Sequence, residues 1–387
     1  MGTTTRAATK RDFRVWKRRC QSHSRAASVY RSFRWTLLCL IVISGVVAGQ
    51  DFDATSGEQP AWVAKKVTAA DTAEQQVLEG RDGWLYPVSE LRALSVGRFW
   101  GERAAEVSRA AKPENADPLA AIVDFHQQLK RSEIRLILVP VPGKVVIYPE
   151  PLATEGEKLE WKASDDVDSE RLDCWHSEFY GVLRARGIEV IDLVPEFRRQ
   201  RFAEGGPLYC RTDSHWTPRA ALLAAENVSA MVAASDWAKG SPRTDYQTRL
   251  GTVQITGDLT VLLGKERGAS ETISIESVRG VRSGTTAAAL VDRSSPVLVI
   301  GDSHTLVFHD PQLFAADSGF PDFVAKQLGM PVDLIGVRGS GATTTRIEIL
   351  RRRDQLAGKK VLIWCLSFRE FTESEAGWRK VPVIPVR

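Results

Sequence analysis

Five short aliphatic runs, alternating with helical patterns, constrain the fold of this chain more than any other feature. The runs cover residues 134–141, 188–193, 297–300, 332–337 and 361–366. Runs of this kind are typical of strands buried on both faces of a parallel sheet. The helical patterns cover residues 118–130, 168–186, 218–234, 322–328 and 344–356. Strands that alternate with helices predict a three-layer α/β/α domain with a mainly parallel sheet.

The rest of the chain divides around this pattern. Residues 50–75 are polar and mixed and are interpreted as a linker, so the globular domain would cover 76–387. Residues 235–295 interrupt the alternation with polar, glycine- and serine-containing segments around a short apolar piece. We interpret this segment as an insertion or a small β-rich lobe over the site.

The N-terminus is strongly basic and is followed by an apolar segment. Residues 1–34 hold ten Lys or Arg and one acid, a charge of +9, so the remaining chain carries 4 − 9 = −5. Residues 35–49 are mostly apolar, which predicts a signal peptide or a signal anchor with the basic tail in the cytoplasm. A buried core helix is the alternative, and cleavage or retention of the segment stays open. A mildly acidic domain argues against nucleic-acid binding.

The five cysteines do not have the spacing of a structural metal site. Cys20 and Cys39 lie in the leader, and Cys365 lies in an apolar strand as a small core residue. Cys174 and Cys210 are candidates for a disulfide if the domain is exported to an oxidising compartment.

A candidate nucleophile follows the third apolar run. The sequence Gly-Asp-Ser-His-Thr at 301–305 would place Ser303 at the carboxyl end of a strand, beside the free N–H groups of a helix start. A serine hydroxyl there can serve in acyl transfer if a base activates it. The alternative is that Asp302 or Ser303 only caps the helix. His304 is a candidate pocket residue.

A candidate base and its partner lie about ninety residues upstream. Asp213 and His215 are two residues apart, so in an extended segment both side chains project to one side. The carboxylate can then orient the imidazole toward a hydroxyl, which completes a Ser-His-Asp triad. Trp216 is a candidate for shielding the pair, and Thr217 with Pro218 predicts a helix start. A surface polar pair is the alternative.

The donors for an oxyanion are less well defined. The glycine-rich turn at 336–344 follows another strand and can present a backbone N–H, so Arg338 and Gly339 are candidates. Arg369, at the end of the last strand, either points into the site or pairs with Glu370. An ordinary β–α turn is the alternative for 336–344. Its spacing does not fit a phosphate-binding motif, and neither a metal nor an organic cofactor is expected.

Together these motifs resemble those of a known family. The segments are GRDGWLY at 80–86, LVPVPGKVVIYP at 138–149, IDLVPEF at 191–197, GDL at 257–259 and GDS at 301–303. In this order they are similar to the SGNH-hydrolase-like proteins of the alginate O-acetyltransferase group, the AlgX/AlgJ-like family. The likeness covers about residues 76–371.

The resemblance implies an SGNH-hydrolase-like fold and a periplasmic or cell-surface acetyltransferase that acts on an exopolysaccharide. It implies Ser303 as nucleophile, His215 as general base and Asp213 as its orienting partner. It also implies that a separate membrane-bound acyltransferase supplies the acetyl group, and that the protein is anchored in the inner membrane through residues 35–49 or exported. The wider superfamily has an Asn in its third block, where this chain offers Ser367 and Arg369.

Three other functions remain open at this stage. An acetylesterase would use the same triad with water as acceptor. A metal-dependent phosphoesterase would use the two Asp-Ser-His segments with His309 and Asp310 as ligands. A non-catalytic polysaccharide-binding protein is the third. The polymer, the acetylated hydroxyl, the acyl donor and the oligomeric state are not determined by the sequence.

Overall fold

A five-stranded parallel sheet lies at the centre of the molecule. The computed structural model describes residues 61–153, 171–264, 270–282, 285–288 and 291–384. The strand order is β4-β3-β10-β8-β9, and every neighbouring pair is parallel. The strands are β3 (Arg135–Val141), β4 (Glu189–Val190), β8 (Val297–Gly301), β9 (Asp333–Gly336) and β10 (Val361–Ser367). All five aliphatic runs are strands of this sheet, although only two residues of 188–193 form β4.

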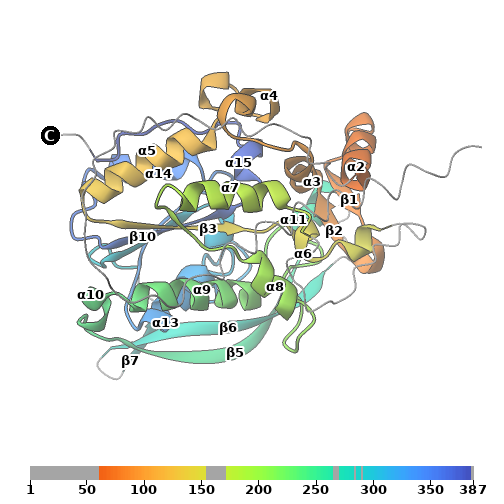
Figure 1. Ribbon diagram of the computed structural model, residues 1–387. Helices are drawn as coiled ribbons and strands as arrows, with labels where there is room; N and C mark the ends of the chain where they lie inside the picture. Colours follow the sequence, from red (N-terminus) through yellow and green to blue (C-terminus); the bar gives the residue numbers. More distant parts are fainter. Residues whose placement is uncertain (1–60, 154–170, 265–269, 283–284, 289–290, 385–387) are drawn as a thin grey trace, which may run out of the picture.

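The two faces of the sheet are buried by different helices, as the aliphatic runs predict. Successive side chains of a strand point to opposite faces. In β3, Ile137 and Val139 therefore join one core, whereas Leu136 and Leu138 join the other. Figure 1 shows α5, α7 and α14 on one side of the sheet and α9 and α13 on the other. These helices are α5 (Pro118–Arg131), α7 (Cys174–Arg184), α9 (Pro218–Ala233), α13 (Phe320–Leu328) and α14 (Thr343–Arg352).

Local sequence signals account for the ends of these helices. Asp117 caps α5 by accepting a hydrogen bond from the Leu119 N–H, and Pro118 is its first residue. Thr217 holds the N-cap position of α9 ahead of Pro218, as predicted, but its hydroxyl donates to the Pro207 carbonyl instead of capping.

The segment that interrupts the alternation forms an antiparallel hairpin. Strand β5 (Asp245–Ile255) pairs with β6 (Glu271–Arg282), and β6 pairs with β7 (Thr285–Ala288). Figure 1 shows the hairpin beneath α9 and α13, which makes it an additional layer on that side. The turn between β5 and β6 contains α11 (Asp258–Leu262), and α10 (Asp236–Lys239) precedes β5.

Shorter elements gather around the carboxyl edge of the sheet and the N-terminal part of the described chain. They are α2 (Ala61–Thr72), β1 (Val77–Glu79), β2 (Leu85–Pro87), α3 (Val88–Ser95), α4 (Ala104–Val107), α6 (Lys144–Ile147), α8 (Val194–Gln200), α12 (Ser303–Leu306) and α15 (Glu370–Glu373). Four 3-10 turns, at Arg81–Gly83, Gly101–Arg103, Pro113–Asn115 and Glu150–Leu152, connect some of them.

Part of the expected linker is helical. Residues 61–72 form α2, because Val63, Val67 and Ala70 lie on one face and are buried. The predicted apolar segment at 35–49 and the basic tail lie outside the described residues. Within the described residues, no helix combines the length and the apolar character needed to cross a bilayer.

The suggested disulfide between Cys174 and Cys210 is absent, which corrects that expectation. Cys210 is a free, fully buried thiol whose Sγ faces the Trp216 carbonyl at 3.9 Å. Cys174 instead begins α7, where its Sγ contacts the Arg171 carbonyl. The two residues belong to separate parts of the fold, a relation that their sequence separation does not reveal.

Candidate active site

Ser303 lies at the sharp corner between β8 and α12. Gly301 makes this corner possible, because a Cβ there would sit 1.8 Å from the Cys365 carbonyl oxygen of β10. Asp302 fixes the corner from both sides: its carboxylate accepts the His304 N–H at 2.9 Å and the Ser367 N–H of β10 at 2.7 Å. The Ser303 side chain itself is left partly open to solvent.

Asp213 and His215 lie in a tight loop that precedes α9. The loop is closed by a bridge between Tyr209 and Trp216 and by a bond from the Cys210 N–H to the His215 carbonyl. Within it, Asp213 Oδ1 lies 2.9 Å from the His215 backbone nitrogen and 2.6 Å from His215 Nδ1. The carboxylate therefore orients the ring and turns its other nitrogen outward.

The two segments meet at the carboxyl edge of the sheet. His215 Nε2 lies 2.7 Å from Ser303 Oγ, so the three side chains form one continuous hydrogen-bonded chain. Burial alone would lower the pKa of His215, but the Asp213 carboxylate, together with Asp258 and Asp302, outweighs burial and raises it. Burial likewise opposes ionisation of Asp213, yet the charge and hydrogen bond of His215 hold the pKa of that carboxyl well below its usual range.

A buried lysine supports this loop from the other side. Lys144 is fully buried, and its Nζ donates to the Asp213 carbonyl at 2.6 Å and to the Leu85 carbonyl at 2.7 Å. Burial lowers the pKa of Lys144, which the nearby Glu90 and Asp213 carboxylates partly offset. In the sequence, Lys144 appears only within the segment 138–149 that is similar to the family. The sequence signal that could have identified Lys144 is its position as a lone charged residue within the apolar stretch after a strand.

The two pocket candidates from the sequence are buried beside the site. Trp216 is fully buried, and its indole N–H donates to the His304 carbonyl at 3.0 Å. The His304 ring packs against the His215 ring with 4.7 Å between centroids, and burial lowers the pKa of His304. Both side chains therefore shape the wall behind His215 rather than an open surface.

The oxyanion candidates occupy different surroundings. Arg338 is exposed and forms an ion pair with Asp310, while Gly339 has φ +77° in an open turn. Arg369 is partly buried and donates to Ser89 Oγ at 2.9 Å. None of these three makes a hydrogen bond to the Ser303–His215–Asp213 chain within the described residues.

Two backbone N–H groups of the glycine-rich turn already donate hydrogen bonds within the protein, so they are not free to bind an oxyanion. Gly341 and Ala342 donate to one oxygen of Glu370, at 3.1 and 3.2 Å. By contrast, none of the hydrogen bonds among the described residues uses the Ser303 N–H. This group lies beside the hydroxyl and is an oxyanion donor candidate, one of the free N–H groups that the sequence predicts at this helix start.

Three acidic or imidazole groups of the site are close enough to be considered as metal ligands. Each group offers one potential ligand atom, and these atoms lie within 4.8 Å of one another; the residues are Asp213, His215 and Asp258. Each of these residues is, however, engaged in the hydrogen bonds of the loop. His309, proposed as a ligand in the metal alternative, instead contacts Asp322 at 2.9 Å.

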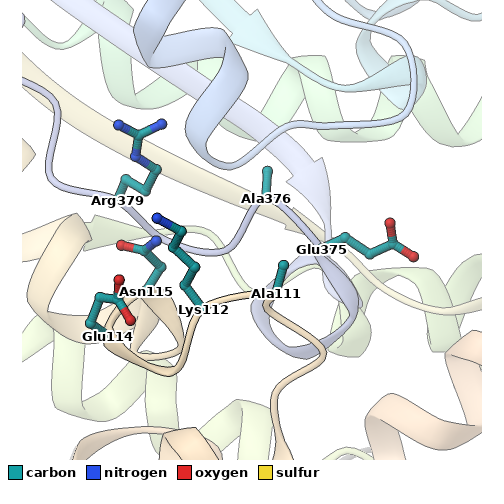
Figure 2. Close-up of a pocket in the computed structure, with 7 residues that line it drawn as sticks. All are labelled: Ala111, Lys112, Glu114, Asn115, Glu375, Ala376 and Arg379. Carbon is teal, nitrogen blue, oxygen red and sulfur yellow. The ribbon is translucent and has the colours of Figure 1, made fainter.

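A separate cavity of about 460 Å³ lies between the 3-10 turn at Pro113–Asn115 and the chain after α15. Figure 2 shows the residues that line it, which are Ala111, Lys112, Glu114, Asn115, Glu375, Ala376 and Arg379. None of them belongs to the candidate active site, and the cavity carries charges of both signs.

The fold and the site together define an SGNH-hydrolase-like α/β protein. The chain belongs to the family of SGNH hydrolase-like domains described as acetyltransferase AlgX, whose family model matches residues 77–368. The family resemblance and the fold predicted from the sequence are thereby confirmed.

Relatives and solved structures agree with this assignment. The chain is 26% identical over 202 residues to the probable alginate O-acetylase AlgJ of Pseudomonas syringae pv. tomato, covering 52% of this chain and 45% of that protein. It is 25% identical over 203 residues to the AlgJ of Pseudomonas aeruginosa, covering 52% and 44%. The chain thus spans less than half the length of these curated relatives.

Two solved structures share the fold. The O-acetyltransferase domain of Pseudomonas putida AlgJ matches with a TM-score of 0.53 at 20% identity, over 76% of this chain and 92% of that chain. AlgX of Pseudomonas aeruginosa matches with a TM-score of 0.56 at 16% identity, over 79% of this chain and 65% of that chain.

Proposed function

We propose that this protein is an O-acetyltransferase that moves acetyl groups to hydroxyls of an exported polysaccharide. The single observation that carries the proposal is the chain from Asp213 through His215 to Ser303, with contacts of 2.6 and 2.7 Å, in a member of the AlgX acetyltransferase family. The names of the relatives support alginate or a similar polymer as acceptor.

The proposed reaction has two balanced steps. Ser303 Oγ attacks the carbonyl carbon of an acetyl donor while His215 Nε2 takes the hydroxyl proton. The leaving group departs with that proton and leaves an acetyl ester on Ser303. A sugar hydroxyl then attacks the ester, passes its proton to His215, and Ser303 recovers its proton as the acetylated sugar leaves. Asp213 holds the imidazole and stabilises its protonated form.

The surroundings of the reaction are part of the proposal. The protein would act on the periplasmic or cell-surface side, anchored or exported through residues 35–49. A membrane-bound acyltransferase would present the acetyl group. The Ser303 N–H would stabilise the oxyanion, with Gly339, Arg338 or Arg369 as further candidates once substrate is bound.

A comparison of acceptors tests the proposal. The purified domain is incubated with an activated acetyl ester, with and without alginate oligosaccharides, and the products are analysed by mass spectrometry. Sugar-dependent formation of acetylated oligosaccharide is expected. Hydrolysis at the same rate with and without sugar would instead identify an acetylesterase, and loss of activity to a chelator would favour a metal-dependent enzyme.

The pKa of His215 gives a second expectation, on pH dependence. A protonated imidazole cannot accept the Ser303 proton, so kcat/KM must fall as the pH falls through the pKa of His215. Because Asp213 raises this pKa, we expect the acid limb of the profile to lie above the ordinary imidazole value of 6.5. Measuring kcat/KM against pH with an acetyl ester checks it, and an acid limb at or below 6.5 would contradict it.

A further inference from the structure

The turn end of the β5–β6 hairpin contacts the segment that leads to His215. Glu271, the first residue of β6, accepts the Arg211 N–H at 2.9 Å and the Thr212 N–H at 2.8 Å. Its carboxylate also accepts the Thr212 hydroxyl at 2.6 Å. One acidic side chain of the hairpin therefore satisfies two consecutive backbone donors just before Asp213.

The backbone of the hairpin turn touches the same segment directly. A Cβ at Gly257 would lie 2.1 Å from the Thr212 carbonyl oxygen and 2.5 Å from the Asp213 nitrogen, so only glycine fits. The Thr260 N–H, one turn further into α11, reaches the Thr212 carbonyl at 3.3 Å. This contact between two backbones brings the start of α11 against the loop.

Asp258 occupies the position between these contacts and the candidate active site. Its carboxylate accepts the Ser214 N–H at 2.7 Å and also the Ser214 hydroxyl. Its own backbone N–H donates to Asp213 Oδ2 at 2.8 Å. Asp258 is therefore hydrogen-bonded to Asp213 and to Ser214, the buried residue between Asp213 and His215.

We propose that Asp258 is a positioning residue of the active site, which holds Ser214 and thereby sets Asp213 and His215 against the β8–α12 corner. The inference rests on the proposed function, and it makes the β5–β6 hairpin a part of the catalytic unit rather than an independent lobe. A misplacement of about 1 Å can cost on the order of 10²-fold in rate, so a residue that fixes this loop affects turnover without touching substrate.

The charge of Asp258 adds a measurable signature. The charged or titratable groups that face His215 are Asp213 in its own loop, Asp258 at α11, Asp302 at the end of β8 and, through ring contact, His304. Asp258 and Asp302 both favour the protonated imidazole, after the larger influence of Asp213. Removing the Asp258 charge should therefore lower the pKa of His215.

The activity test compares Asp258→Ala and Asp258→Asn with the wild type and with Asp245→Asn. Asp245 lies exposed at the far end of the same hairpin, so its variant makes the same charge change away from the site. We expect Asp258→Ala to lower kcat by about 10- to 100-fold with little change in KM. Asp258→Asn keeps an oxygen for the Ser214 N–H and should recover most of the loss. A kcat within about two-fold of wild type in Asp258→Ala overturns the proposal.

A titration that needs no activity separates this inference from the proposed function. Proteins with isotope-labelled histidine are titrated by NMR, with the His215 signal identified from its loss in His215→Gln. We expect Asp258→Asn to lower the pKa of His215 by about half a unit or more, and Asp245→Asn to leave it unchanged. If the pKa of His215 is unchanged in Asp258→Asn, the proposed role of Asp258 is overturned. If that pKa falls in Asp258→Asn as expected but the wild-type protein transfers no acetyl group, only the proposed function is overturned.

Discussion

Replacing Ser303 with alanine should reduce acetyl transfer by about 10⁴-fold or more, because it removes the hydroxyl on which the acetyl ester would form. Among the residues that the structure describes, the side chain makes one hydrogen bond, to His215 Nε2, and it is partly exposed, so the fold should be retained. Turnover of an activated acetyl ester and acetylation of oligosaccharide measure the loss. Mass spectrometry of the wild type after rapid quenching should find an acetyl group on the peptide that contains Ser303.

Ser274→Ala is the matched control for this substitution. Ser274 is exposed on β6, and its replacement should leave both turnover and melting temperature close to those of the wild type. If polysaccharide acetylation persists in Ser303→Ala at the rate seen in Ser274→Ala, Ser303 is not the nucleophile. The non-catalytic, polysaccharide-binding alternative would then gain support.

Replacing Lys144 with methionine should lower the free energy of unfolding by about 3 kcal/mol and impair turnover as well. The ammonium donates to the buried carbonyls of Leu85 and Asp213, and a buried carbonyl left without a donor costs about 1–3 kcal/mol. Methionine has a similar length, so the loss of these hydrogen bonds should dominate over changes in packing. Urea unfolding measures the effect as a lower midpoint at an unchanged slope.

Lys130→Met supplies the control, since Lys130 is exposed at the end of α5. That variant should stay within about 0.5 kcal/mol of the wild type. Equal stability and equal turnover of the Lys144 and Lys130 variants would show that Lys144 does not support the Asp213 loop. Reduced stability with unchanged turnover would restrict Lys144 to the stability of the fold.

The central sheet was predictable because its strands are buried on both faces. Burial on both faces selects runs of aliphatic residues, and those runs can be recognised without knowing the topology. The shortness of β4 was not predictable, since Ile188 and Ile191 are buried in the core just outside the two residues that pair with β3. Helix α2 was missed because only three of its residues are buried, so its helical pattern is weak.

The candidate site was predictable only in part. Ser303, His215 and Asp213 lie in short ordered motifs, and the tertiary structure brings them within hydrogen-bonding distance. The residues that hold the loop are single acidic or basic side chains far along the chain, such as Lys144, Asp258 and Glu271. A lone charged residue has no periodic or spacing signal, so its role becomes visible only when its neighbours are known.

The sequence by itself determined the class of fold and the chemical groups available for acyl transfer, because hydrophobic periodicity and short motifs are local properties of the chain. Only the tertiary structure decided which backbone groups those side chains contact. It brought the β5–β6 hairpin against the Asp213 loop and left Cys174 and Cys210 unjoined to each other. These outcomes depend on contacts between segments distant in sequence, whose geometry is set by the packing of the whole domain.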